Sequence, residues 1–124
     1  MKKIARTIVL IVTILAMSFT VGCLGGTKDE KPELVGTPTM SVEYRSYSEY
    51  YSVEIKGTIK NTTTKAYDWV DIEFVLYDAD GNNLGTASDT IFNLLAGDTW
   101  NFTATDMFLD GEPCSFQLIE ISAH

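Results

Sequence analysis

From about Met40 onward, apolar and polar residues alternate along the chain with a period of two, a pattern that indicates β-strands. Two runs are clearest, one over residues 51–60 and one over residues 70–77. The first run places Tyr51, Val53, Ile55, Gly57 and Ile59 on one face; the second places Val70, Ile72, Phe74 and Leu76 inward and Asp71, Glu73, Val75 and Tyr77 outward. Both runs therefore predict half-buried antiparallel strands.

Turn-forming residues separate these runs from weaker ones. Residues 61–65, 94–98 and 110–113 have turn composition, and Asp80-Gly81 has the composition of a hairpin turn. Weaker alternation covers residues 83–91 and 99–104, and a last run covers residues 114–122, where the pattern slips and leaves the face of Ile119 undecided. No stretch of ten residues shows helical periodicity. Residues 40–124 are therefore predicted to form an all-β domain, an immunoglobulin-like antiparallel β-sandwich of about seven strands.

The chain begins with the pattern of a secretory signal peptide. A basic start with Lys2, Lys3 and Arg6 precedes an apolar core over residues 8–19, and small residues follow up to Gly22. The apolar core is shorter than the roughly 20 residues that a membrane-spanning helix needs, so a retained spanning helix is the second interpretation. Residues 1–22 are predicted to be a signal peptide.

The end of this segment resembles the lipobox of prokaryotic lipoproteins. Gly22-Cys23 matches the pattern, and Thr20 stands where an aliphatic residue is commonest. The resemblance implies that Cys23 is lipidated and becomes the new N-terminus, with two acyl chains that anchor the protein to the cell membrane, or to the outer membrane of a Gram-negative cell. Cys114 is then the only other cysteine, so no intramolecular disulfide is expected.

Residues 23–39 have the composition of a flexible linker. They combine charge with Gly25, Gly26, Pro32, Gly36 and Pro38 and show no periodicity. Cleavage before Cys23 would remove three of the nine basic residues and none of the 17 acidic ones, so the remaining chain carries a net charge of −11. This acidity favours solubility and makes nucleic acid a poor partner.

The domain resembles the FxLYD domain family. The signature Phe74-Val75-Leu76-Tyr77-Asp78 is present in full, and three further motifs match in order: Gly57 to Asn61, Leu84-Gly85 and Leu95 to Phe102. The resemblance covers roughly residues 40–121, and Ala96 stands where members more often carry proline. It implies an immunoglobulin-like sandwich on prokaryotic extracytoplasmic proteins, and it implies structural roles for Phe74, Leu76, Tyr77 and Asp78. It supplies no activity, because the family has no assigned catalytic residues.

Few residues of this chain are candidates for catalysis. A nucleophile needs a base, and the only histidine is His124, the last residue of the sequence, which is expected to be frayed. Cys114 has no second histidine to activate it. The protein is therefore predicted not to be an enzyme and to need no cofactor.

One turn has oxygen side chains in the order that calcium sites use. Asp78, Asp80 and Asn82 alternate around Gly81, but the glycine and the last acid do not have EF-hand spacing. We expect a hairpin turn in which aspartates cap backbone amides, with a weak calcium site as the alternative.

The most unusual local composition is residues 44–51, which contain four tyrosines with Arg45 and two serines between them. Tyrosine offers a wide contact area with a polar tip at little entropic cost, so Tyr44, Tyr47 and Tyr50 are candidates for partner binding. The alternative is that they pack around a turn between two strands.

The two tryptophans and the two glycosylation sequons indicate where residues lie in the fold more than what the protein does. Trp100, in phase with Phe102, is expected in the core, and Trp69, out of phase with Val70, at a rim. Asn61 and Asn101 each begin a glycosylation sequon, a motif short enough to occur by chance. The sequence thus predicts a lipid-anchored extracytoplasmic module that binds or scaffolds an envelope or surface protein; the alternative is a calcium- or small-ligand-binding accessory module.

Overall fold

The computed structural model describes residues 7–10 and 31–124. Cys23, residues 24–30 and most of the predicted signal peptide lie outside the described residues. Within the described part the chain forms strands and no helix, and therefore no helix that could cross a membrane. The strands are β1 (Thr7–Leu10), β2 (Glu33–Arg45), β3 (Tyr50–Lys60), β4 (Tyr67–Tyr77), β5 (Asn83–Leu94), β6 (Thr99–Leu109) and β7 (Ser115–Ala123).

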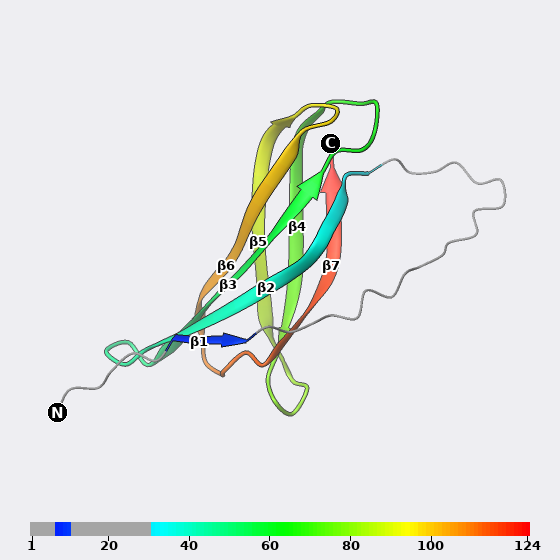
Figure 1. The fold of residues 1–124 in the computed structure, drawn as a ribbon. Coiled ribbons are helices and arrows are strands. Elements are labelled where there is room, and N and C mark those ends of the chain that lie inside the picture. Colours follow the sequence, from blue (N-terminus) through cyan, green and yellow to red (C-terminus); the bar gives the residue numbers. More distant parts are fainter. Residues whose placement is uncertain (1–6, 11–30) are drawn as a thin grey trace.

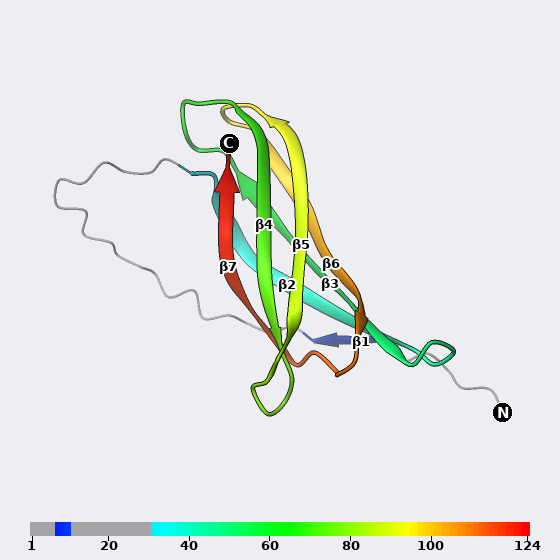
Figure 2. The same cartoon turned by 180° about the vertical axis from the view of Figure 1, so that it is seen from behind.

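All paired strands are antiparallel, in the order β1-β2-β3-β6-β5-β4-β7. The sheet curls so that β2, β3 and β6 face β5, β4 and β7 across a shared core (Figures 1 and 2). The fold line runs between β5 and β6, which are joined through the single ladder pair Ser88 and Thr105. The prediction of an all-β antiparallel fold is confirmed, and the arrangement is sandwich-like.

The sheet extends further toward the N-terminus than the alternation predicts. Strand β2 begins at Glu33, inside the segment predicted to be a flexible linker. Gly36 has a φ of 73° and Pro38 is buried, and the pairing with β3 shifts register between Val35 and Thr39. Glycine and proline therefore form a bulge here, a position where sheets tolerate both residues.

Six strands, β2 to β7, lie within residues 33–123, and the seventh, β1, comes from the predicted signal peptide. The four residues of β1 pair with residues 40–43 on the outer edge of β2. Cleavage before Cys23 would remove β1 and leave β2 at the edge of the sheet.

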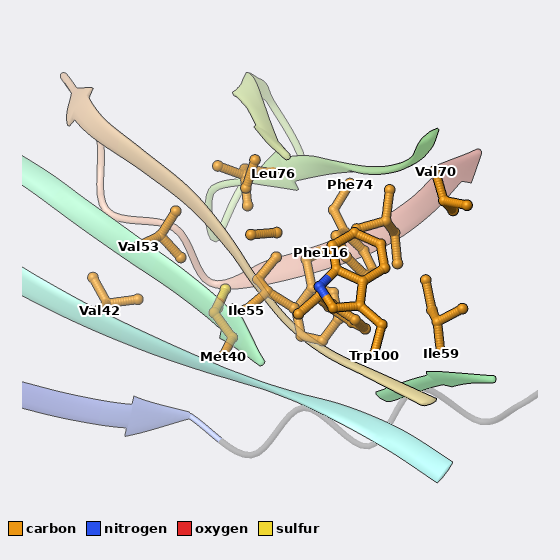
Figure 3. Packing of buried hydrophobic residues seen from close by; sticks show 14 of the residues in the cluster. Met40, Val42, Val53, Ile55, Ile59, Val70, Phe74, Leu76, Trp100 and Phe116 are labelled. Carbon is orange, nitrogen blue, oxygen red and sulfur yellow. The ribbon is translucent and has the colours of Figure 1, made fainter. Parts of the chain in front are cut away.

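The core fills the space between the two halves of the sheet (Figure 3). On β4 the core contains Tyr67 and the four inward positions expected from the alternation, Val70, Ile72, Phe74 and Leu76, which are all fully buried. Phe74 stacks on Phe102 at 5.8 Å between ring centroids and meets Phe116 edge to face at 5.5 Å. Phe74 thus joins side chains from β6 and β7.

Two positions differ from the expected alternation. Val75, expected to face solvent, is only 7% exposed. Strand β4 is central in its half of the sheet, so Val75 has Thr86 of β5 on one side and Gln117 of β7 on the other. The pairing of β4 with β7 also shifts by one residue, which leaves Ile119 without a partner and exposed. The slip in the sequence pattern is therefore a β-bulge.

The expectation that His124 is frayed is wrong. Its backbone N–H donates to the Trp69 carbonyl at 3.0 Å, and its carbonyl accepts from the Asp68 N–H at 2.7 Å. The imidazole ring lies 4.5 Å from the Trp69 ring. His124, which follows the last residue of β7, is therefore hydrogen-bonded to β4.

The strand registers define two ends of the molecule. The entry end is where residues 31–34 lead into β2. It also comprises residues 59–69, 92–100 and 124. The hairpin end comprises residues 43–52, 77–83 and 106–115, including the β2–β3 hairpin. Figure 1 shows the chain terminus marked C at the entry end and the β2–β3 hairpin projecting from the opposite end.

Candidate functional site

The β2–β3 hairpin presents Tyr47 to solvent. The hairpin closes on the pair Arg45 and Tyr50, and the N–H groups of Ser48 and Glu49 both donate to the Arg45 carbonyl, at 3.2 and 2.9 Å. Glu49 has a φ of 58°, a left-handed conformation that is uncommon outside glycine and closes this turn. Tyr47, at the tip, is 84% exposed.

Arg45 and Tyr50 flank the tip on the outer face of the sheet. The Arg45 guanidinium donates to the Tyr47 hydroxyl at 3.5 Å, and this hydrogen bond together with the charge of Glu43 raises the pKa of Arg45. Tyr50 is exposed, and its ring meets Phe108 edge to face at 5.8 Å. Two aromatic side chains from β3 and β6 are therefore already in contact with each other at the surface.

Met107 and Phe108 reach this face because of a bulge in β6. The pairing shifts from Tyr51 opposite Leu109 to Val53 opposite Asp106, so two residues of β6 stand opposite one of β3. Both side chains are exposed, Phe108 by 72%. Neither residue was among the candidates predicted from the sequence. The signal was the run Met107-Phe108-Leu109, whose three consecutive apolar residues break the alternation.

Together Arg45, Tyr47, Tyr50, Met107 and Phe108 form an aromatic platform on the outer face of β2, β3 and β6. The sequence placed Tyr44 in the same group, but Tyr44 is directly opposite Tyr51, with ring centroids 4.8 Å apart. Tyr51 packs against the core, and burial, followed by the charge of Glu112, raises its pKa. Tyr47 and Tyr50 thus belong to the platform, and Tyr44 lies on the face that turns toward the core.

A shallow groove of about 180 Å³ adjoins the platform on the same face. Arg45 and Met107 belong to both the platform and the groove. The other residues that line the groove are mostly polar, with two valines among them: Ser41, Val42, Glu43, Ser52, Val53, Glu54 and Thr105. Small-molecule sites usually enclose at least about 300 Å³, so the groove offers polar contacts beside the platform more than a pocket for a ligand.

The turn after β4 is organised by Asp78. One carboxylate oxygen accepts from the N–H groups of Asp80 and Asn82, at 2.9 and 2.8 Å, and the other accepts from the Asn82 side-chain amide at 3.1 Å. The backbone N–H and the side-chain amide of Asn82 hold the pKa of Asp78 below its usual 3.8. Among residues 31–124 no group of three or more His, Cys, Asp or Glu side chains is arranged to hold a metal ion. Both Asp78 oxygens thus have partners inside the turn.

Cys114 and His124 are held at opposite ends of the molecule. The Cys114 thiol is free and partly buried, and burial followed by the charge of Glu112 raises its pKa, which lowers its reactivity. The Cys114 N–H donates to the Tyr77 carbonyl at 2.7 Å, at the hairpin end, whereas His124 packs on Trp69 at the entry end. The described residues therefore form no cysteine–histidine pair.

Searches against protein-family models, curated proteins and solved structures found no match for this chain.

Proposed function

We propose that this protein is a lipid-anchored extracytoplasmic module with an immunoglobulin-like fold that binds a protein of the cell envelope without catalysis. The signal-like pattern of residues 1–22, the lipobox-like Gly22-Cys23 and the likeness to FxLYD domains support the location. The observation that carries the binding role is the aromatic platform. Its two most exposed aromatic side chains, Tyr47 and Phe108, are 84% and 72% open to solvent.

The platform has the composition of a protein-binding surface. Tyrosine and arginine dominate the residues that contribute most to binding energy at interfaces, and exposed apolar clusters on soluble domains usually mark such sites. The contact of Tyr50 with Phe108 and the hydrogen bond from Arg45 to Tyr47 hold four side chains in place before binding. Less side-chain entropy is then lost when a partner docks.

The surroundings of the platform favour a partner that carries basic residues. Arg45 is the only basic residue at the hairpin end, and the acidic residues at this end are Glu43, Glu49, Asp78, Asp80, Asp106, Asp110 and Glu112. Lysine or arginine on the partner would meet opposite charge at the rim and aromatic faces at the centre. The proposed partner surface is therefore basic with apolar anchors.

Site-specific crosslinking in intact cells tests this proposal. A photoreactive residue at Ser46, beside the platform, is expected to capture one reproducible envelope protein, and the substitutions Tyr47→Ser and Phe108→Ser are expected to abolish the capture without lowering the melting temperature appreciably. Ile119→Ser is the matched control, because Ile119 is also exposed but lies on β7. Capture that survives both platform substitutions, or that is lost equally with Ile119→Ser, would contradict the proposal.

A calcium- or small-ligand-binding role has less support. The Asp78 oxygens already accept hydrogen bonds within the turn, and the groove is small for a ligand. Titration with calcium up to the millimolar range discriminates between the two roles, since a calcium site would raise the melting temperature and a plain hairpin turn would not.

A further inference from the structure

A second exposed aromatic cluster lies at the entry end, on the outer face of the other half of the sheet. Trp69 of β4 and Phe92 of β5 are directly opposite each other in the ladder, out of phase with the buried Val70. Trp69 is 40% exposed and Phe92 69% exposed, and Leu95, in the turn that follows β5, is exposed as well. We call Trp69, Phe92 and Leu95 the entry-end patch.

The entry end is also where basic residues gather. Lys31, Lys60 and Lys65 are all exposed and lie at this end, alongside the acidic Glu33, Asp68 and Asp98. The hairpin end, by contrast, has seven acidic residues and only Arg45 to oppose them. The charge of the domain is therefore polarised along its length, with the strongly negative end farthest from Lys31.

Residues 23–30, which follow the predicted cleavage site, join the described chain at Lys31, at this end. From Cys23 to Lys31 the chain spans at most about 28 Å when fully extended. Under the lipid anchor proposed above, the entry end is thus held within a short distance of the lipid headgroups, and the acidic hairpin end is the part that an anionic membrane surface would repel.

We infer that the entry-end patch rests on the lipid surface, with Trp69, Phe92 and Leu95 at the headgroup boundary and the aromatic platform facing away from the membrane. Aromatic side chains with a polar group favour this boundary, and leucine and phenylalanine add buried apolar area. The three lysines of the entry end balance its three acidic residues, so anionic headgroups repel this end far less than the acidic hairpin end. This inference depends on the proposed lipid anchor; it adds an orientation that the anchor by itself does not impose.

Tryptophan fluorescence provides a direct test, because the chain has two tryptophans and Trp100 is only 7% exposed. The full chain, purified from cell membranes, is placed in phosphatidylcholine–phosphatidylglycerol vesicles whose acyl chains are brominated near the headgroup. The wild-type protein is expected to lose up to about half of its emission, the share of one of two tryptophans near the quencher. The Trp69→Phe variant, which retains only Trp100, should lose almost none.

A second variant separates specific docking from simple nearness to the bilayer. Phe92→Ser leaves both tryptophans in place and is expected to reduce the quenching severalfold. Ile119→Ser, at another exposed apolar position but on β7, should leave the quenching unchanged. Quenching that is absent in the wild type, or unaffected by Phe92→Ser, overturns the inference.

The lipid anchor is measured separately, by incorporation of a labelled fatty acid that the Cys23→Ser variant should lack. If the wild type is labelled and floats with the vesicles but Trp69 is not quenched, only the docking fails. If the wild type is neither labelled nor vesicle-bound, the anchor and the docking both fail.

Discussion

The ring of Phe102 occupies the space in which any side chain at position 57 would begin. The two residues are directly opposite each other on β6 and β3, and a Cβ atom on Gly57 would lie 2.6 Å from Phe102 Cζ. Phe102 also stacks on Phe74 and contacts Trp100 edge to face at 5.9 Å, so the ring has little room to move. A glycine in mid-strand, normally unfavourable, is thus what allows this aromatic cluster to close over β3.

Gly57→Ala should therefore destabilise the domain. Adding one methyl group to a close-packed site typically costs about 1–3 kcal/mol, and the cost here should approach the upper part of that range because the clash is with a confined ring. The free energy of unfolding in urea measures it.

A double-mutant cycle identifies the cause of that loss. In a Phe102→Leu background the ring is absent, so Gly57→Ala should cost much less than in the wild type. Equal costs in the two backgrounds would show that backbone effects, and not the ring, determine the loss.

From a fully buried position, the Asn61 side chain connects its own turn, residues 61–65, to the end of β5. Its side-chain amide donates to the carbonyls of Lys65 and Leu94, at 2.7 and 3.3 Å, and its side-chain oxygen accepts from the Thr63 N–H at 3.1 Å. We expect Asn61→Ala to cost about 3 kcal/mol, because it removes the three hydrogen bonds of a fully buried polar side chain and takes a partner from the buried Leu94 carbonyl. Denaturation in urea reports the change.

Asn101 is the matched control for Asn61, since both begin a sequon. Asn101 is exposed, and its side chain accepts one hydrogen bond, from Thr58 at 2.9 Å. Asn101→Ala should change stability by only about 0.5 kcal/mol. Similar costs at both positions would contradict the role assigned to Asn61. Burial also makes the Asn61 sequon inaccessible in the folded domain.

The sequence predicted the fold well where one physical signal dominated. Inward positions such as Val70 and Ile72 alternate cleanly, and alternation reports directly which face of a strand is buried. Bulges were harder to predict, because a single extra residue reverses the faces that follow it. Gly36 and Pro38 thus resembled a linker, and Ile119 could not be assigned a face.

The candidate sites show the same limit. Local composition was enough to single out Tyr47 and Tyr50, which are close together in the sequence. Phe108 joins them only through the pairing of β3 with β6 and the bulge in β6, and neither feature leaves a distinct local pattern. Likewise Trp69 was placed at a rim from its phase, but its partner Phe92 is set by the register of β4 with β5. A local sequence pattern does not show which strands pair with each other or in which register.

Asp89 replaces ladder hydrogen bonds at the fold line between β5 and β6. Its two carboxylate oxygens accept from the N–H groups of Thr103 of β6 and Thr90 of β5, each at 2.8 Å. Asp89→Ala should cost about 1–2 kcal/mol, because the Thr103 N–H loses its acceptor at the place where the two halves of the sheet are joined. Asp89→Asn, which keeps an acceptor oxygen, should cost less; a reversed order of the two variants in urea denaturation would exclude this role.

Asp78 should make the stability of the domain depend on pH. Its pKa in the folded state lies below 3.8, mainly through the hydrogen bonds from Asn82, so folding favours the charged form. The stabilisation is fully present above the unfolded-state pKa and is lost as the pH falls through the lower folded-state value. Asp78→Asn should therefore have a lower melting temperature than the wild type above about pH 5, and the gap should narrow below about pH 4 and close once the pH lies below the folded-state pKa of Asp78. Asp80→Asn serves as the control, because only the backbone of Asp80 is held in the turn; a gap for Asp78→Asn that stays constant down to low pH would show that its carboxylate charge does not stabilise the hairpin.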